Sequence, residues 1–252
     1  MKIITVDAKK YLIASKHILG AVAFLLVLAL SLQGSSIFFS NKALYYEEVC
    51  ALADKKTVII DAGHGGEDCG AIGKNGSYEK DLNLQVAYTL GEMLTEKGYA
   101  VIYTRTEDKL LYTDEENIKG IRKISDLKNR CKIAKEYPDS VFISIHMNSF
   151  TDPKYSGLHV YYSQNNDSSK ELASMVQSNV IRTLQKDNNR TIKPGKSIYV
   201  LENIENTAIL IECGFLSNPE ECEKLSQKEY QKELCFSIMC AMIEYIENKN
   251  SV

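Results

Sequence analysis

Five short apolar runs along the chain have the composition of β-strands. All of them are rich in β-branched and aromatic residues, which favour strands over other structures. The runs span residues 57–61 (TVIID), 99–104 (YAVIYT), 141–146 (VFISIH), 158–163 (LHVYYS) and 208–212 (AILIE). We therefore predict a strand at each of these five places.

Three longer segments between these runs repeat apolar residues at helical spacing. They span residues 79–97, 168–186 and 227–247, and Gly98 ends the first of them. A polar stretch at 106–126 predicts a long surface loop, which leads into a fourth helix carrying Leu127, Cys131 and Ala134. The alternation of strands and helices predicts an α/β domain with a largely parallel central sheet flanked by helices.

The N-terminus has a different pattern from the rest of the chain. Four lysines in the first 16 residues precede an uncharged apolar run at 18–32, which is the pattern of an export signal. We predict that residues 1–40 are a signal peptide or membrane anchor, with cleavage left open. Residues 41–55 form a predicted linker, and residues 56–250 a single catalytic domain. The lysines predict that this domain lies outside the cytoplasmic membrane.

Charge and cysteine content narrow the classes of partner and site. The 252 residues carry a net charge of −3 with no visible basic face, which argues against a nucleic-acid partner. The seven cysteines are an odd number and contain no CxxC pair, so a zinc site built from cysteines is not expected. Free thiols in an exported protein indicate a compartment that is not strongly oxidising.

Two of the four histidines lie where an open α/β sheet gathers its functional groups. His64 follows the first predicted strand on a glycine-rich turn, and His146 ends the third. A catalytic zinc site needs three protein ligands, commonly two imidazoles and a carboxylate, and one open position. Glu79, at the start of a predicted helix, is the best third ligand. It could equally be a favourable acid in a first helical turn.

Glu212 ends a predicted buried strand, where an acid is costly unless it has a partner or a task. A carboxylate beside an activated water can act as a general base and then return the proton to a leaving amine. The alternative is a strand-end acid that faces solvent or pairs with a lysine.

Four ordered motifs resemble a known family. VIIDAGHGGEDCGAIG, a downstream glutamate that opens a helix, SIHMNS and IECGFLSN are similar to the zinc-dependent N-acetylmuramoyl-L-alanine amidases of the Amidase_3 type. The resemblance covers about residues 57–247 and implies an α/β sandwich around one mixed sheet. It implies that His64, Glu79 and His146 bind Zn²⁺ and that Glu212 is the catalytic acid and base.

Four further residues near these motifs have predicted roles or depart from the pattern. Asn148 could line a substrate groove or cap a loop. His159 is expected to be a strand residue without a catalytic role. Cys69 replaces a proline that is usual in the family motif, and Cys213 directly follows Glu212; neither change removes a predicted ligand.

The resemblance implies a hydrolase that cuts the amide bond between N-acetylmuramic acid and L-alanine in peptidoglycan. The single domain behind an N-terminal segment is similar to spore-cortex amidases of the CwlD type, which implies muramic δ-lactam formation, sporulation or germination, and the space between the forespore membranes. A vegetative wall autolysin, a zinc peptidase cutting within the stem peptide and an inactive wall-binding scaffold remain alternatives. Expected partners are peptidoglycan, the membrane through the N-terminal segment, and an activating protein.

Overall fold

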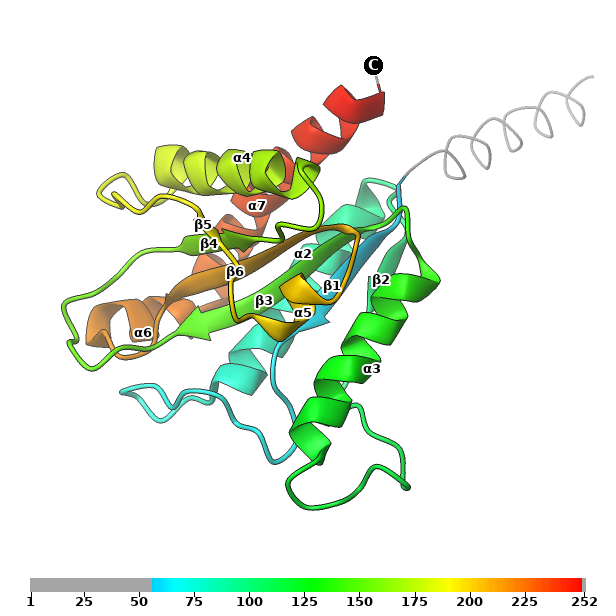
Figure 1. The fold of residues 1–252 in the computed structure, drawn as a ribbon. Coiled ribbons are helices and arrows are strands. Elements are labelled where there is room, and N and C mark those ends of the chain that lie inside the picture. The colour runs from blue at the N-terminus through cyan, green and yellow to red at the C-terminus, as the bar shows by residue number, and fades with distance from the viewer. Residues whose placement is uncertain (1–55, 251–252) are drawn as a thin grey trace, which may run out of the picture. The chain divides into compact units, whose positions relative to one another are not determined.

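Residues 56–250 of the chain are described by a computed structural model, and the predicted export segment and linker lie outside them. Six strands form one sheet with the order β2-β1-β3-β6-β4-β5 (Figure 1). Their bounds are Val58–Ala62 (β1), Val101–Tyr103 (β2), Val141–Asn148 (β3), His159–Tyr162 (β4), Lys193–Pro194 (β5) and Thr207–Phe215 (β6).

The sheet is mixed and largely parallel, as predicted. Strands β2, β1, β3 and β6 run parallel to one another, whereas β4 is antiparallel to β6 and β5 is parallel to β4. The carboxyl ends of β1, β3 and β6 therefore meet at one edge of the sheet, where open α/β sheets place their sites. This edge is the lower left end of the sheet in Figure 1.

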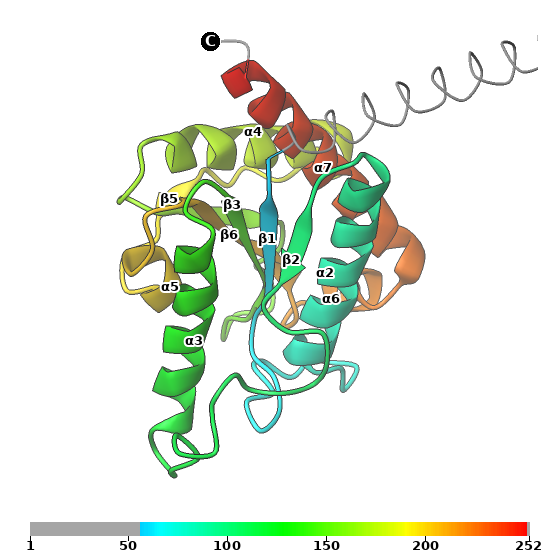
Figure 2. The same ribbon diagram turned by 90° about the vertical axis from the view of Figure 1, so that its right-hand side faces the viewer.

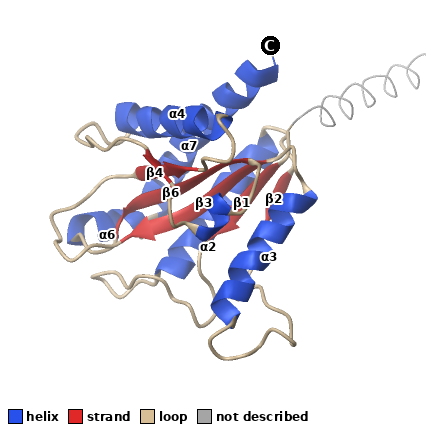
Figure 3. Cartoon of the chain, in the orientation of Figure 1, coloured by secondary structure: helices blue, strands red, loops and turns tan. Residues whose placement is uncertain are grey.

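Helices cover both faces of the sheet and make a three-layer domain (Figures 2 and 3). The helices are Glu79–Glu96 (α2), Arg122–Glu136 (α3), Ser168–Thr183 (α4), Tyr199–Glu202 (α5), Pro219–Leu225 (α6) and Lys228–Asn250 (α7). One apolar core joins α2, α4, α6 and α7 to the sheet, and a smaller core joins α3 and α5 to the opposite face.

Alternating side chains along the central strands supply the two cores. Val58 and Ile60 face the larger core and Ile59 the smaller one, and all three are fully buried. This alternation is the period of two that a strand imposes on its side chains. Because both faces of β1 are covered, its sequence begins with three consecutive apolar residues instead of alternating apolar and polar ones.

Three short elements were not predicted, and several predicted boundaries differ. Strands β3 and β6 continue past His146 and Glu212, to Asn148 and Phe215, so neither residue ends its strand as predicted. Helix α3 begins at Arg122, inside the stretch 106–126 that was predicted as loop, because polar residues there give weak periodicity. Strand β5 and helices α5 and α6 are too short for a periodic pattern. Among residues 56–250, no helix is long and apolar enough to span a membrane.

Candidate metal centre and catalytic edge

Three side chains from separate parts of the chain converge at the carboxyl edge of the sheet. His64 follows β1, His146 lies near the end of β3, and Glu79 is the first residue of α2. The carboxylate oxygen Oε1 of Glu79 lies 3.1 Å from Nε2 of His64 and 3.0 Å from Nδ1 of His146. One ligand atom from each residue lies within 4.8 Å of the others, a spacing that could hold a metal ion.

Glu79 is buried, and backbone groups hold its carboxylate in place. Its Oε1 accepts a hydrogen bond from the backbone N–H of Met147 (3.1 Å), and its Oε2 accepts one from Ala71 (2.8 Å). The backbone N–H of Glu79 in turn donates to the carbonyl of Ala71 (2.9 Å). The loop between β1 and α2 thus returns the start of the helix to the sheet edge.

Two glycines leave the space that the three side chains fill. A Cβ atom on Gly63 would lie 2.1 Å from Nε2 of His146, and one on Gly70 would lie 2.5 Å from Oε2 of Glu79. Gly70 also has a φ of +65°, which side-chain-bearing residues rarely adopt. The glycine-rich motif therefore allows the backbone to approach the imidazole and the carboxylate closely.

The electrostatics of the cluster favour a bound cation. Burial alone would raise the pKa of Glu79, but hydrogen bonds from His146 and His64 outweigh it and hold that pKa well below its usual range. Burial would lower the pKa of His64, but Asp68 and Glu79 together raise it to about 9. Without a metal, a proton on His64 therefore balances the charge of the buried carboxylate.

Asp68 is a site residue that motif reading had not singled out. Its Oδ2 lies 3.0 Å from Nδ1 of His64, although Nδ1 lacks the alignment of a hydrogen bond. Metal-binding histidines commonly direct their second ring nitrogen towards a carboxylate, which fixes the ring. Lys123 Nζ, 3.1 Å from the same carboxylate oxygen, also holds Asp68. The only sequence signal was an acid four residues after His64.

Glu212 lies on β6 beside the cluster, in register with His146 on β3. Its Oε2 is shielded from solvent and has no hydrogen-bond partner among the described residues. Burial, assisted by the charge of Glu79, raises the pKa of Glu212 to about 7, against the opposing effect of the two histidines. This carboxyl group is therefore able to exchange a proton near neutral pH.

His159, Asn148 and Cys213, which the sequence analysis named near the motifs, make contacts that serve the fold. His159 lies on β4 opposite Glu212, and its Nε2 donates to the carbonyl of Thr191 (2.9 Å). Asn148 ends β3, and its backbone carbonyl accepts a hydrogen bond from Leu216 (2.8 Å). Cys213 is fully buried, as cysteines in apolar surroundings usually are.

The cysteines of the described residues are all free thiols. Cys69 and Cys240 are partly exposed, and the others are buried; these are Cys131, Cys213, Cys222 and Cys235. Cys69 Sγ donates a hydrogen bond to the backbone carbonyl of Gly70, and no cysteine of the described residues belongs to the cluster of His64, Glu79 and His146. The thiols therefore take no part in the candidate metal centre.

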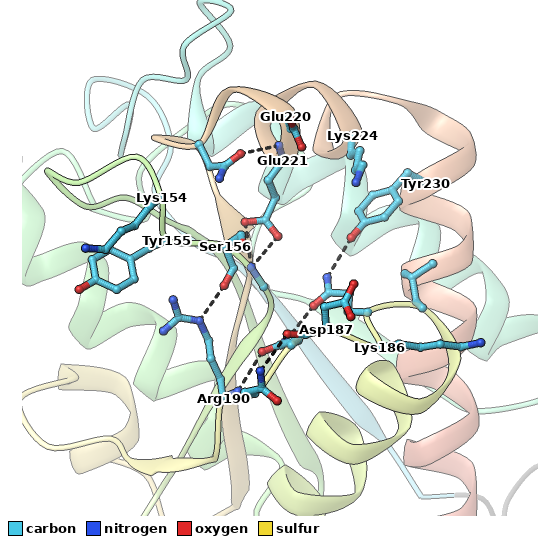
Figure 4. Close-up of a pocket in the computed structure, with 16 residues that line it drawn as sticks. Lys154, Tyr155, Ser156, Lys186, Asp187, Arg190, Glu220, Glu221, Lys224 and Tyr230 are labelled. Carbon is cyan, nitrogen blue, oxygen red and sulfur yellow. Dashed lines mark hydrogen bonds between the residues drawn. The ribbon is translucent and has the colours of Figure 1, made fainter.

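A separate pocket of about 530 Å³ lies beside α6, α7 and the loop after α4 (Figure 4). Its lining includes Lys154, Arg190, Glu221 and Tyr230, and both carboxylate oxygens of Glu221 accept the N–H of Gly157. Neither Glu212 nor any of the three candidate ligands lines it. The pocket is thus distinct from the candidate metal centre.

An α/β sheet with two histidines and a glutamate at its carboxyl edge is the arrangement of a metal-dependent hydrolase, and comparison with known sequences identifies the family. The sequence pattern of the N-acetylmuramoyl-L-alanine amidases matches residues 58–244, so the chain belongs to this family. The matched stretch begins at β1 and ends within α7, and thus includes every residue of the candidate site.

Individual relatives place the chain more closely within the family. It is 34% identical over 194 residues to the germination-specific N-acetylmuramoyl-L-alanine amidase of Bacillus subtilis (strain 168), covering 77% of this chain and 81% of the relative. The CwlD amidase of Clostridioides difficile, solved in complex with the GerS lipoprotein, is 39% identical to this chain with a TM-score of 0.73. The match covers 77% of this chain and 99% of that structure. An N-acetylmuramoyl-L-alanine amidase from Clostridium difficile 630 is 34% identical with a TM-score of 0.68. The match covers 78% of this chain and 99% of that structure.

Proposed function

We propose that this chain is a zinc-dependent N-acetylmuramoyl-L-alanine amidase that hydrolyses the amide bond between N-acetylmuramic acid and L-alanine of peptidoglycan. The observation that carries the proposal is the position of Glu212, whose buried oxygen lacks a partner among the described residues, beside the three-ligand cluster, where it lies in register with His146 on the neighbouring strand β3. Family membership over residues 58–244 supports the substrate class.

His64, Glu79 and His146 would hold the metal. Two imidazoles and one carboxylate with a fourth position left open are the donor set of catalytic zinc sites. The cluster fits this need because its three ligand atoms lie within 4.8 Å of one another. When bound, zinc would supply Lewis-acid polarisation of the scissile carbonyl and lower the pKa of water in the site.

Glu212 would act as the general base and then as the general acid. Its carboxylate takes a proton from the attacking water and later delivers that proton to the nitrogen of the leaving L-alanine. A pKa near neutrality suits both steps, because the group must lose and regain a proton at the working pH. The products are a free stem peptide and a sugar strand without that peptide.

The cellular role that we propose is muramic δ-lactam formation in spore cortex. The germination-specific relative from Bacillus subtilis and the CwlD amidase of Clostridioides difficile support it. The predicted export segment would place the domain outside the cytoplasmic membrane, in the space between the forespore membranes where cortex is assembled. The segment would anchor the chain to the membrane or be removed after export.

We further propose that this chain acts with a protein partner. The supporting observation is that the CwlD amidase, 39% identical to this chain, was solved in complex with a lipoprotein. Purification of the tagged full chain from sporulating cells, followed by identification of co-eluting proteins, tests this point. A chain that elutes alone and is fully active alone would contradict it.

Product analysis tests the enzymatic proposal. Residues 56–250 and the Glu212→Gln variant should be incubated with purified peptidoglycan and the products identified by mass spectrometry. We expect free stem peptides that begin with L-alanine from the wild type only. Shortened stem peptides still attached to sugar would instead identify a zinc peptidase, and no cleavage would favour an inactive scaffold.

A null mutant tests the cellular role separately from the chemistry. We expect spores whose cortex lacks muramic δ-lactam, because the peptide must be removed before the lactam can close. Spores with normal lactam would contradict the cortex role and favour a vegetative autolysin, while leaving the enzymatic activity unaffected.

A further inference from the structure

The turn that presents His64 has a backbone that needs support. His64 has a φ of 61°, in the left-handed region that residues with a side chain rarely adopt. Such a strained conformation persists only where its surroundings fix it. The surroundings of residues 62–64 are therefore informative about how the metal centre is built.

Two buried arginines bind consecutive carbonyl groups of this turn. Arg105 donates from Nε to the carbonyl of Ala62 (2.8 Å) and from Nη2 to that of Gly63 (3.0 Å). Arg130 donates from Nη1 to Ala62 (2.7 Å) and from Nη2 to the carbonyl of His64 (2.8 Å). Every carbonyl from residue 62 to residue 64 thus accepts a hydrogen bond from a guanidinium group.

Arg105 also joins this turn to the helix that carries the second candidate ligand. Its Nη2 donates to the carbonyl of Lys80 (2.7 Å), one residue after Glu79. Arg105 is 2% exposed, and its hydrogen bonds within the described part of the chain all go to backbone carbonyls. Burying a guanidinium charge that is hydrogen-bonded to four carbonyls and to no carboxylate costs free energy. A role in fixing the backbone would explain why the chain keeps an arginine here.

Arg130 joins the turn to the strand that carries the third candidate ligand. Its Nη1 donates to Asp61 (2.6 Å) and its Nε to Asp126 (2.8 Å). The other oxygen of Asp61 accepts from Ser144 Oγ (2.6 Å), two residues before His146 on β3. The arginine pair, with Asp61 and Ser144, therefore connects all three ligand-bearing segments through hydrogen bonds that involve no ligand side chain.

We propose that Arg105 and Arg130 are positioning residues that hold residues 62–64 and the first turn of α2 in the geometry that binds the metal. The inference rests on the proposed zinc site. Their guanidinium groups set the distances among the three ligands, and so control the affinity of the site for zinc. Because neither arginine lies among the reacting groups, turnover at saturating zinc depends on them only weakly.

Zinc affinity of conservative variants tests this inference. Arg105→Lys and Arg130→Lys keep the charge but lose the planar fork that reaches two carbonyls at once. We expect zinc to bind about 10- to 100-fold more weakly in both, the effect typical of residues that orient metal ligands. The dissociation constant is measured by competition with a chromophoric chelator, alongside the melting temperature of the metal-free protein. Turnover should return towards the wild-type rate at saturating zinc.

Two controls separate this inference from simple loss of stability and from failure of the zinc site. Arg182→Lys changes an exposed arginine on α4, which hydrogen-bonds Asn179, and should leave zinc affinity unchanged. If the lysine variants melt earlier but bind zinc like the wild type, the arginines are merely structural and the inference is overturned. If the wild type itself binds no zinc, the proposed metal site fails instead.

A milder variant keeps the test available if the lysine variants do not fold. Asp126→Asn removes one of the two carboxylates that hold Arg130, while the amide oxygen can still accept from the backbone N–H of Leu111. We expect zinc to bind several-fold more weakly, in the same direction as the arginine variants. Unchanged zinc affinity in a folded Asp126→Asn protein would overturn the role of Arg130.

Discussion

Two regions of the catalytic edge are built in opposite ways. At the ends of β1 and β3, the candidate metal ligands are enclosed by hydrogen bonds: Glu79 accepts from two backbone N–H groups and lies within 3.1 Å of both imidazoles. At β6, Glu212 holds a shielded oxygen that none of the described residues contacts by a hydrogen bond. The pKa of Glu79 is lowered and that of Glu212 is raised.

This contrast follows from what the two carboxylates must do under the proposed function. A metal ligand works best when its charge is permanent and its position fixed, which opposite charges and backbone donors provide. A general base must take up and release a proton, which burial without a partner favours. Environment can therefore give different roles to two glutamates at one edge of a sheet.

Removal of the metal ligands should have the largest effect. Replacing His64 and His146 together by alanine takes two of three ligands from the site, so we expect loss of bound zinc and abolished hydrolysis of peptidoglycan. Metal analysis and a muropeptide release assay measure both. Full retention of zinc in the double variant would show that the metal binds elsewhere.

Glu212→Gln should lose turnover while keeping the metal. The amide has nearly the same shape but cannot accept the proton, and general acid–base groups typically contribute on the order of 10²–10⁴-fold in rate. The measurement is kcat together with zinc content. Loss of zinc in this variant would identify Glu212 as a ligand, and a rate near that of the wild type would remove its proposed catalytic role.

Much of this edge could be predicted from the sequence because strands and glycines leave clear patterns. His64 and His146 stand at the ends of apolar runs, and parallel strands bring such ends together. Glu79 was ambiguous from its pattern, since a helix start explains an acid equally well. The structure places its carboxylate between the two histidines.

The supporting residues could not be predicted in the same way. Arg105 lies between the second predicted strand and the segment predicted as loop, and Arg130 occupies a helix, where an arginine is ordinarily solvent-exposed. Both are buried through contacts with residues more than 40 positions away. Periodicity describes local structure, and it does not report which distant carbonyls a long side chain reaches.

The pH dependence should follow Glu212. A base is competent only when deprotonated, so kcat/KM should fall as the pH drops below the pKa of Glu212 and reach a plateau above it. That pKa is about 7 in the absence of metal, and the positive charge of zinc should place the acid limb at or below that value. A pH–rate profile measures it, and the residual activity of Glu212→Gln should lack this limb.

His159→Phe should have the smallest effect on activity and so tests how far the catalytic edge extends along the sheet. His159 lies opposite Glu212 in register, yet its Nε2 is engaged by the carbonyl of Thr191 and its pKa is lowered to about 4, chiefly by burial and then by Lys193. A neutral imidazole that already donates its proton to the backbone is suited to holding β4 and the segment that leads into β5 together. The phenyl ring preserves most of the packing, so we expect kcat within about two-fold of wild type and a loss of about 1 kcal/mol in the free energy of unfolding.

His159→Gln, which retains a donor for Thr191, should recover part of that stability. A large fall in kcat for His159→Phe with unchanged zinc content would instead make His159 a positioning residue for Glu212.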